Sequence, residues 1–121
     1  MKKITYIFVL SFFFINCDKK QEVNTITTSE LKVLLSKEKV QLLDVRTQKE
    51  IKEGFIETAF FANFYDENFY TQATVKLDKT KPVYLYCRSG NRSGKAGVIL
   101  QEKGYKVVNV LGGYNQWKQE N

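Results

Sequence analysis

Cys87 is the residue of this chain whose type and surroundings point most directly to chemistry. It follows an apolar and aromatic run, residues 83–86, and opens a polar loop that contains Gly90 and Arg92. A thiol that ends a buried strand and precedes a helix meets the free N–H groups and the positive dipole end of that helix. Together with the neighbouring Arg88, this setting favours the thiolate, which is the nucleophilic form of cysteine.

The loop after the cysteine supplies the groups that such a nucleophile needs. Its residues are Arg88, Ser89, Gly90, Asn91, Arg92 and Ser93. Their main-chain N–H groups can curve around the sulfur and stabilise its negative charge, and Gly90 provides backbone freedom for the curve. Arg88 is the expected contact for an oxyanion. Arg92 either binds the same anion or pairs with a carboxylate and braces the loop. Ser93 is expected to cap the helix and to hydrogen-bond the sulfur.

The chain has no histidine, and this removes several classes of enzyme. Neither Ser-His-Asp nor Cys-His catalysis is possible, and no zinc site with histidine ligands can form. The sequence contains no phosphate-binding P-loop and no dinucleotide-binding glycine fingerprint. We therefore expect no metal and no cofactor, and the loop itself must activate Cys87.

The loop and its surroundings resemble the active-site half of a rhodanese-like, single-domain sulfurtransferase. The residues that carry this resemblance are Cys87-Arg88-Ser89-Gly90-Asn91-Arg92-Ser93, Gly104-Tyr105, Leu111-Gly112-Gly113-Tyr114 and Trp117. The first half of the family pattern is present as Leu42-Leu43-Asp44-Val45-Arg46-Thr47, Glu50, Gly54-Phe55-Ile56 and Ala59. The resemblance covers nearly the whole chain after residue 22. The family usually has histidine where this chain has Phe55, a departure that is expected to alter packing rather than chemistry.

The resemblance implies a sulfur-transfer reaction at Cys87. The thiolate would take the outer sulfur of a small sulfur-containing anion, such as thiosulfate, or of a persulfide donor. It would hold that sulfur as a persulfide and pass it to a thiol or to cyanide. Asp44 and Arg46 match the family's first motif as supporting residues. Because Arg46 and Glu50 lie four positions apart across a helix start, we expect them to form a local ion pair with Asp44 nearby.

Two other functions fit parts of the same pattern. A rhodanese fold can also serve as a non-catalytic sulfur carrier or protein-binding module at a membrane, although the intact Cys87 and both loop arginines favour catalysis. A dual-specificity phosphatase of related fold would have histidine before its cysteine and arginine six positions after it. Here Tyr86 precedes the cysteine and Arg92 lies five positions after it, so the shorter loop fits sulfur better than phosphate.

The N-terminal segment, residues 1–16, resembles the signal peptide of a bacterial lipoprotein. Lys2 and Lys3 precede an apolar run, residues 4–15, which is short for a membrane-spanning helix but suits a signal-peptide core. Cys17 follows at the position of the lipid-bearing cysteine. We expect lipid on Cys17 to anchor the protein to a membrane.

Three segments follow from this reading of the chain: a signal peptide at residues 1–16, the lipidated cysteine and a polar tether at residues 17–22, and one domain at residues 23–121. The protein is then exported and sits in the cell envelope, on its periplasmic or surface face. With Cys17 bearing lipid, Cys87 has no internal disulfide partner.

The charge of the chain gives little support to nucleic-acid binding. Its net charge is +6, to which Lys2 and Lys3 contribute, and the remaining excess is dispersed along the sequence. No basic stripe with interleaved aromatic residues is present.

Short strands alternate with short helices along the domain. We expect strands at residues 23–26, 40–45, 59–62, 83–86 and 106–111. Helices are expected after residue 27, after residue 47, and at residues 66–77, 93–103 and 114–119. This alternation favours an α/β fold, a parallel sheet with helices on both faces, and the family resemblance implies five strands. Ligands of such sheets bind at the carboxyl ends of the strands. Tyr114 and Trp117 are expected in the core.

Overall fold

A computed structural model describes residues 22–121 of the chain. The elements run in the order β1 (Asn24–Ile26), α1 (Thr28–Lys37), β2 (Gln41–Asp44), α2 (Gln48–Lys52), β3 (Phe60–Phe61), α3 (Phe69–Thr74), β4 (Val83–Tyr86), α4 (Asn91–Glu102), β5 (Val107–Val110) and α5 (Gly113–Glu120). The proposed signal peptide, Cys17 and most of the proposed tether lie outside the described residues. None of the helices in residues 22–121 is long and apolar enough to cross a membrane.

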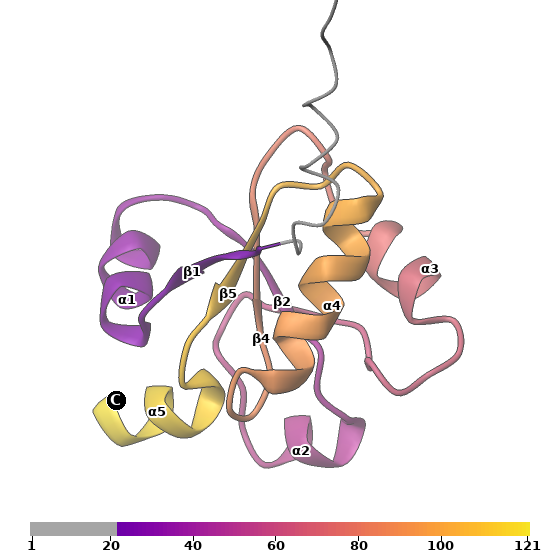
Figure 1. Cartoon of the computed structure of the whole chain (residues 1–121). Helices are drawn as coiled ribbons and strands as arrows, with labels where there is room; N and C mark the ends of the chain where they lie inside the picture. The colour runs from indigo at the N-terminus through magenta and orange to yellow at the C-terminus, as the bar shows by residue number, and fades with distance from the viewer. Residues whose placement is uncertain (1–21) are drawn as a thin grey trace, which may run out of the picture.

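The five strands form one sheet in the order β1-β5-β4-β2-β3, and every neighbouring pair is parallel. The expected α/β fold with a five-stranded parallel sheet is therefore confirmed. Strand β4 lies at the centre, with Leu85 paired to Leu43 of β2 on one side and to Asn109 of β5 on the other. Because all strands are parallel, their carboxyl ends share one edge of the sheet, at the bottom of Figure 1.

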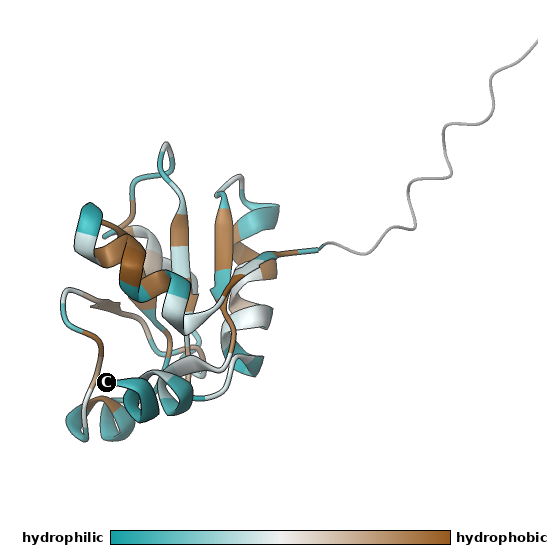
Figure 2. Ribbon diagram, turned by 90° about the vertical axis from the view of Figure 1, so that its left-hand side faces the viewer, coloured by the Kyte–Doolittle hydropathy of each residue, from teal (hydrophilic) through white to brown (hydrophobic). Residues whose placement is uncertain are grey.

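Helices cover both faces of the sheet (Figure 1). Helices α1 and α5 lie together on one face, and α3 and α4 lie on the other. Side chains of a strand point alternately to its two faces, and β4 follows this rule. Val83 and Leu85 join the core beneath α3 and α4, whereas Tyr84 and Tyr86 face the core that includes Leu31 of α1. In Figure 2 strongly hydrophobic residues lie on the strands and on the helix in front of them, whereas the helix beside the C-terminal label is largely hydrophilic.

Two capping boxes begin the first two helices, at the positions where the sequence predicts helices to start. The Thr27 side chain accepts a hydrogen bond from the N–H of Glu30, whose carboxylate accepts one from the N–H of Thr27. Thr47 and Glu50 form the same reciprocal pair at the start of α2. Each box satisfies main-chain donors that a helix start leaves free.

Glycines with positive φ follow two of the helices. Gly54, with φ +142°, follows α2. Gly104, with φ +97°, follows the last residues of α4, and there the N–H of Tyr105 reaches back to the carbonyl of Leu100. A glycine with positive φ together with this hydrogen bond forms a Schellman motif, which ends the helix.

Several expected boundaries differ from the structure. Helix α3 covers only Phe69–Thr74 within the expected 66–77, because residues 63–68 form turns in which Asn63, Asp66 and Gln72 bond to one another. Strand β3 is limited to Phe60–Phe61. Gly113 belongs to α5 rather than to the preceding turn. These differences move the boundaries of elements without changing their order.

Candidate active site

Cys87 lies immediately after β4, at the carboxyl edge of the sheet, and α4 begins four residues later at Asn91. Its residue is almost wholly buried, and its Sγ accepts the N–H of Gly90 at 3.1 Å. The hydroxyl of Ser93 lies 3.4 Å from the same sulfur. The loop thus curves around Sγ and directs donors toward it.

These donors decide the ionisation of the thiol. Burial raises the pKa of Cys87, but hydrogen bonds from the Ser93 hydroxyl and from the main-chain N–H groups of Ser93, Gly90 and Ser89 outweigh it. The net effect is a pKa below the ordinary value of a thiol. Hydrogen bonds to a charged group favour its charged form, so the loop stabilises the thiolate without a histidine.

The carbonyl groups of Cys87 and Arg88 are hydrogen-bonded to the start of α5. The carbonyl of Cys87 accepts the N–H of Tyr114 at 2.8 Å, and that of Arg88 accepts the N–H of Asn115 at 3.0 Å. Only glycine fits at the start of α5, because a Cβ on Gly113 would lie 2.6 Å from both carbonyl oxygens. Since the carbonyls are held by α5, the N–H groups are left to face Sγ.

Ser93 does not cap α4, contrary to the sequence-based expectation. The helix begins at Asn91, Gly90 is its N-cap with φ +110°, and Ser93 is the third helical residue. From this position its buried side chain reaches back to Sγ, so the expected hydrogen bond to sulfur is present although the expected cap is not. Asn91, the first helical residue, is exposed.

Asn109 of β5 supports the loop and was not singled out from the sequence. Its Oδ1 accepts the Ser93 hydroxyl at 2.6 Å, and its Nδ2 donates to the carbonyl of Gly90 at 3.1 Å. The side-chain amide of Asn109 is therefore hydrogen-bonded both to the loop and to the first turn of α4. The signal in the sequence was a lone polar residue within the apolar run 107–110, because a buried amide needs partners.

Arg92 braces the loop by pairing with Glu50 of α2. Its two terminal nitrogens donate to the two carboxylate oxygens, each at 2.8 Å, and its guanidinium lies 5.3 Å from the ring centre of Tyr65. Of the two roles expected for Arg92, the structure shows the carboxylate pair. The expected local pair between Arg46 and Glu50 is wrong, because Glu50 turns toward the active-site loop.

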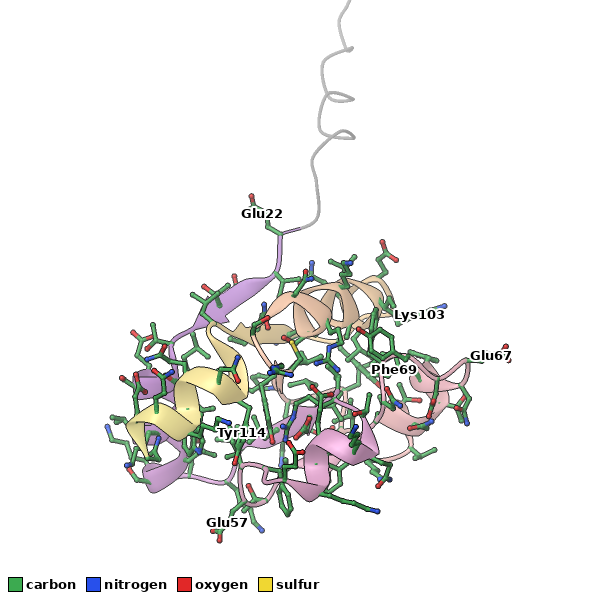
Figure 3. The ribbon with its side chains drawn as sticks, turned by 90° about the horizontal axis from the view of Figure 1, so that it is seen from below. Glu22, Glu57, Glu67, Phe69, Lys103 and Tyr114 are labelled. Atoms are coloured by element: carbon green, nitrogen blue, oxygen red, sulfur yellow. The ribbon has the colours of Figure 1, made fainter. Side chains whose placement is uncertain are left out.

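Asp44 and Arg46 form a separate, buried ion pair. The Arg46 side chain donates to both carboxylate oxygens of Asp44, with a shortest distance of 2.8 Å, and also to the carbonyl of Gly54 at 2.7 Å. The ring of Tyr114 lies 4.4 Å from the guanidinium. Figure 3, which looks onto the carboxyl edge of the sheet, shows Tyr114 reaching from α5 toward this region. The pair fixes the segment after α2 and makes no contact with the sulfur.

Arg88 is the exposed cation of the loop, and Lys49 of α2 is exposed near it. The Arg88 side chain has no ion pair within residues 22–121, and it borders an open depression of about 460 Å³. The other residues that line this depression are Thr47, Lys49, Glu50, Glu53, Tyr65 and Arg92. An anion that enters the depression can therefore meet Arg88 beside Cys87. Ser89, also exposed, contributes its N–H to the sulfur.

Three aromatic residues of the family pattern are structural. Phe55 is 45% exposed and packs edge-to-face against Phe61, with ring centres 5.1 Å apart. Trp117 is half-buried and packs, like Tyr114, against the core that contains Leu31. None of the three is among the groups that surround the sulfur.

Comparison with known proteins identifies the family. The model of the rhodanese-like domain matches residues 27–120, and the chain belongs to that family. Its sequence is 37% identical over 100 residues to YtwF of Bacillus subtilis, provisionally named a sulfurtransferase, and the match covers 82% of this chain and 94% of YtwF. It is 36% identical over 111 residues to thiosulfate sulfurtransferase 18 of Arabidopsis thaliana, covering 82% of this chain and 81% of the relative.

A solved structure gives the same fold. The rhodanese-like domain protein of Staphylococcus aureus superposes with a TM-score of 0.72 at 34% identity, covering 78% of this chain and 91% of the other. The resemblance to rhodanese-like domains is therefore confirmed in both sequence and fold.

Proposed function

We propose that this chain is a rhodanese-type sulfurtransferase in which Cys87 carries sulfur as a persulfide. The observation that supports it best is the buried Sγ that accepts hydrogen bonds from Gly90 and Ser93 at the start of α4. An array of fixed donors stabilises a sulfur anion whether the anion is the thiolate or the persulfide. Relatives named as sulfurtransferases are in keeping with this chemistry.

The reaction consists of two displacements at sulfur. The Cys87 thiolate attacks the outer sulfur of a donor, the bond from that sulfur to the donor breaks, and the donor leaves with the electron pair. With thiosulfate the products are the Cys87 persulfide anion and sulfite. In the second step a thiolate or cyanide attacks the outer sulfur of the persulfide and regenerates the Cys87 thiolate. Charge is conserved in both steps, and no external oxidant or reductant is needed.

The donors of the loop are placed for this sequence of steps. The N–H groups that surround Sγ hold the nucleophile in its anionic form before attack. Arg88, exposed at the edge of the depression, is positioned to attract the oxyanion part of a donor. Because Arg92 is engaged by Glu50, the loop holds its shape as the sulfur arrives.

A sulfur-loading experiment tests this proposal. The full-length chain, purified in detergent, is treated with thiosulfate, and the sulfur that cyanide releases as thiocyanate is measured. We expect loading in the unmodified protein and none in Cys87→Ser. Ser89→Ala, which retains the main-chain donor, is the matched control and should load normally. Absence of loading in the unmodified protein with thiosulfate and with persulfide donors would sink the enzyme proposal, and loading without turnover would favour a sulfur carrier.

We further propose that the protein is a lipoprotein of the cell envelope, anchored through Cys17. The start of the described chain supports an orientation for the site: the carbonyl of Glu22 accepts a hydrogen bond from Gln101, near the end of α4. Gln101 lies about 15 Å along the helix axis from Asn91, at 1.5 Å per residue. The tether would therefore join the domain away from the active-site loop. In Figure 3, Glu22 lies at the margin beside α4.

Fractionation tests the anchor. We expect the unmodified protein in the membrane fraction and Cys17→Ser in the soluble fraction, with Cys87→Ser as the control that keeps the anchor. Membrane association that survives the Cys17 substitution would overturn the lipoprotein proposal without bearing on sulfur transfer.

A further inference from the structure

The depression beside the active site is almost balanced in charge. Its ionised side chains are those of Lys49, Arg88, Arg92, Glu50 and Glu53. The Cys87 thiolate adds a negative charge at the adjoining loop, so the sum is about zero. Thiosulfate carries two negative charges, and a site of this balance offers it little net attraction.

Glu50 is the group that removes one of the two loop arginines from donor binding. Both of its oxygens accept hydrogen bonds from Arg92, and the geometry is the paired form that arginine and carboxylate favour. Glu50 is itself held in place, because one of its oxygens accepts both the N–H and the hydroxyl of Thr47 at 3.0 Å. The position of the carboxylate is therefore set by α2 and does not depend on a bound ligand.

Arg92 would otherwise be well placed for a donor. It lies in the first turn of α4, five residues after Cys87, and both arginines border the same depression. With Arg92 engaged, Arg88 is the loop arginine that has no carboxylate partner within the described residues.

We propose that Glu50 is a specificity-determining residue that selects a singly charged sulfane-sulfur donor, such as an organic thiosulfonate or an alkyl persulfide, over the thiosulfate dianion. This inference rests on the proposed sulfurtransferase function and narrows its donor class. A donor with one negative charge needs one cation, which Arg88 supplies. For the second charge of a dianion the loop, residues 88–93, has Arg92 as its other cation, and Glu50 already neutralises that residue.

The reaction with a singly charged donor balances in the same way as the reaction with thiosulfate. With methanethiosulfonate, the Cys87 thiolate attacks the terminal sulfur and the bond between the two sulfurs breaks. Methanesulfinate leaves with the electron pair, and the Cys87 persulfide anion remains. Since both donors pass the same sulfur and release an oxyanion, they differ chiefly in charge.

Glu50→Gln in the full-length chain is the variant that separates charge from structure. Glutamine is also found at this position of a capping box, because its carbonyl oxygen can accept the Thr47 N–H. The substitution therefore keeps the start of α2 but removes the charge that holds Arg92. Glu53→Gln is the matched control, because it removes the same charge from the same depression without releasing Arg92.

The experiment measures KM and kcat for methanethiosulfonate and for thiosulfate, with cyanide as acceptor. Because electrostatic attraction scales with the charge of the ligand, we expect Glu50→Gln to lower the KM for thiosulfate by roughly three- to tenfold. The KM for methanethiosulfonate should fall by roughly the square root of that factor. Glu53→Gln should change either KM by less than about twofold.

Three results would overturn the inference. The first is an unchanged or higher KM for thiosulfate in Glu50→Gln. The second is an equal loss of activity with both donors in that variant, which would show that Glu50 only braces the loop. The third is an equal fall in the KM for thiosulfate in Glu53→Gln, which would show that the loss of any carboxylate has the same effect.

Arg88→Gln provides a further measurement that does not disturb the Glu50–Arg92 pair. This variant should have a higher KM for both donors, and an unchanged KM for either donor would also overturn the inference. Failure of the proposed function is distinct from all of these, because the unmodified protein would then load sulfur from neither donor.

Discussion

The carboxylate of Glu50 and the guanidinium of Arg92 face each other through two parallel hydrogen bonds, each 2.8 Å long, although the residues lie 42 positions apart in the sequence. This pair joins the helix after β2 to the loop after β4. The first half of the chain thereby helps to hold the loop on which the nucleophile of the second half depends.

The Glu50–Arg92 pair should make stability depend on pH in the acidic range. Hydrogen bonds from Arg92 lower the pKa of Glu50 to about 2, against the opposing effect of burial. A carboxyl group with a lowered pKa in the folded state contributes stability above its unfolded pKa of about 4.3 and loses it as the pH falls through the folded value. We expect Glu50→Gln to lower the free energy of unfolding by about 1 kcal/mol at neutral pH, as partly exposed pairs do.

Urea unfolding at neutral pH and at about pH 3 measures this difference between the unmodified protein and Glu50→Gln. The difference should shrink as the pH falls below about 4.3. A difference that stays constant over that range would contradict the assignment to the ion pair.

Removal of the Ser93 hydroxyl should make the Cys87 thiol less reactive near neutral pH. The hydroxyl favours the thiolate, so Ser93→Ala should raise the pKa of Cys87 and reduce the thiolate fraction. We expect alkylation by iodoacetamide at about pH 7 to slow by roughly three- to tenfold, with little change at high pH, where the thiolate is fully formed. In Ser89→Ala, where the main-chain donor remains, the rate should stay within about twofold; if Ser89→Ala slows equally, the hydroxyl of Ser93 is not the cause.

Gly113→Ala should be more destabilising than Gly90→Ala. Both glycines have positive φ, but a Cβ on Gly113 meets carbonyl oxygens at 2.6 Å, whereas one on Gly90 has no neighbour closer than 3.7 Å. Backbone strain alone costs about 1–3 kcal/mol, and the clash at Gly113 must in addition displace α5 from the loop. Free energies of unfolding from urea titration provide the comparison. Equal losses would show that the contact between α5 and the loop carbonyls contributes little.

Removal of Arg46 should destabilise the fold without a direct effect on donor binding. In Arg46→Leu the carboxylate of Asp44, which has no exposed surface, loses its charged partner. Breaking a buried pair in this way costs about 3–5 kcal/mol. The double variant Asp44→Leu/Arg46→Leu should be less destabilised than Arg46→Leu, because no unpaired charge remains. If the double variant loses at least as much stability as the single one, hydrogen bonds other than the ion pair are responsible.

Local features of this molecule could be predicted from the sequence because their causes are local. The boxes at Thr27 and Thr47 each lie within three residues of their partner, and the apolar run before Cys87 defines the strand that carries it. Gly104 ends a helix for the same reason, since its φ of +97° suits glycine. The order of these elements was enough to predict the parallel sheet.

The partners of charged side chains were harder to predict because spacing alone does not choose among them. Glu50 lies only four positions from Arg46 in the sequence, but Arg46 pairs with the buried carboxylate of Asp44 and Glu50 pairs with Arg92. The role of Asn109 depends on the register between β4 and β5, which places it beside Leu85 two residues before the nucleophile. These partners are distant in the sequence and are brought together only by the packing of the folded chain.

The bonds from Tyr114 and Asn115 to the carbonyls of Cys87 and Arg88 also bear on where the reactivity of the thiol comes from. Both donors belong to α5, the last helix of the described chain, and the loop that surrounds Sγ belongs to the segment between β4 and α4. A peptide of residues 83–103 alone would lack the contacts that hold these two carbonyls, and its cysteine should behave as an ordinary thiol. The lowered pKa of Cys87 is therefore a property of the folded domain, not of the loop sequence by itself.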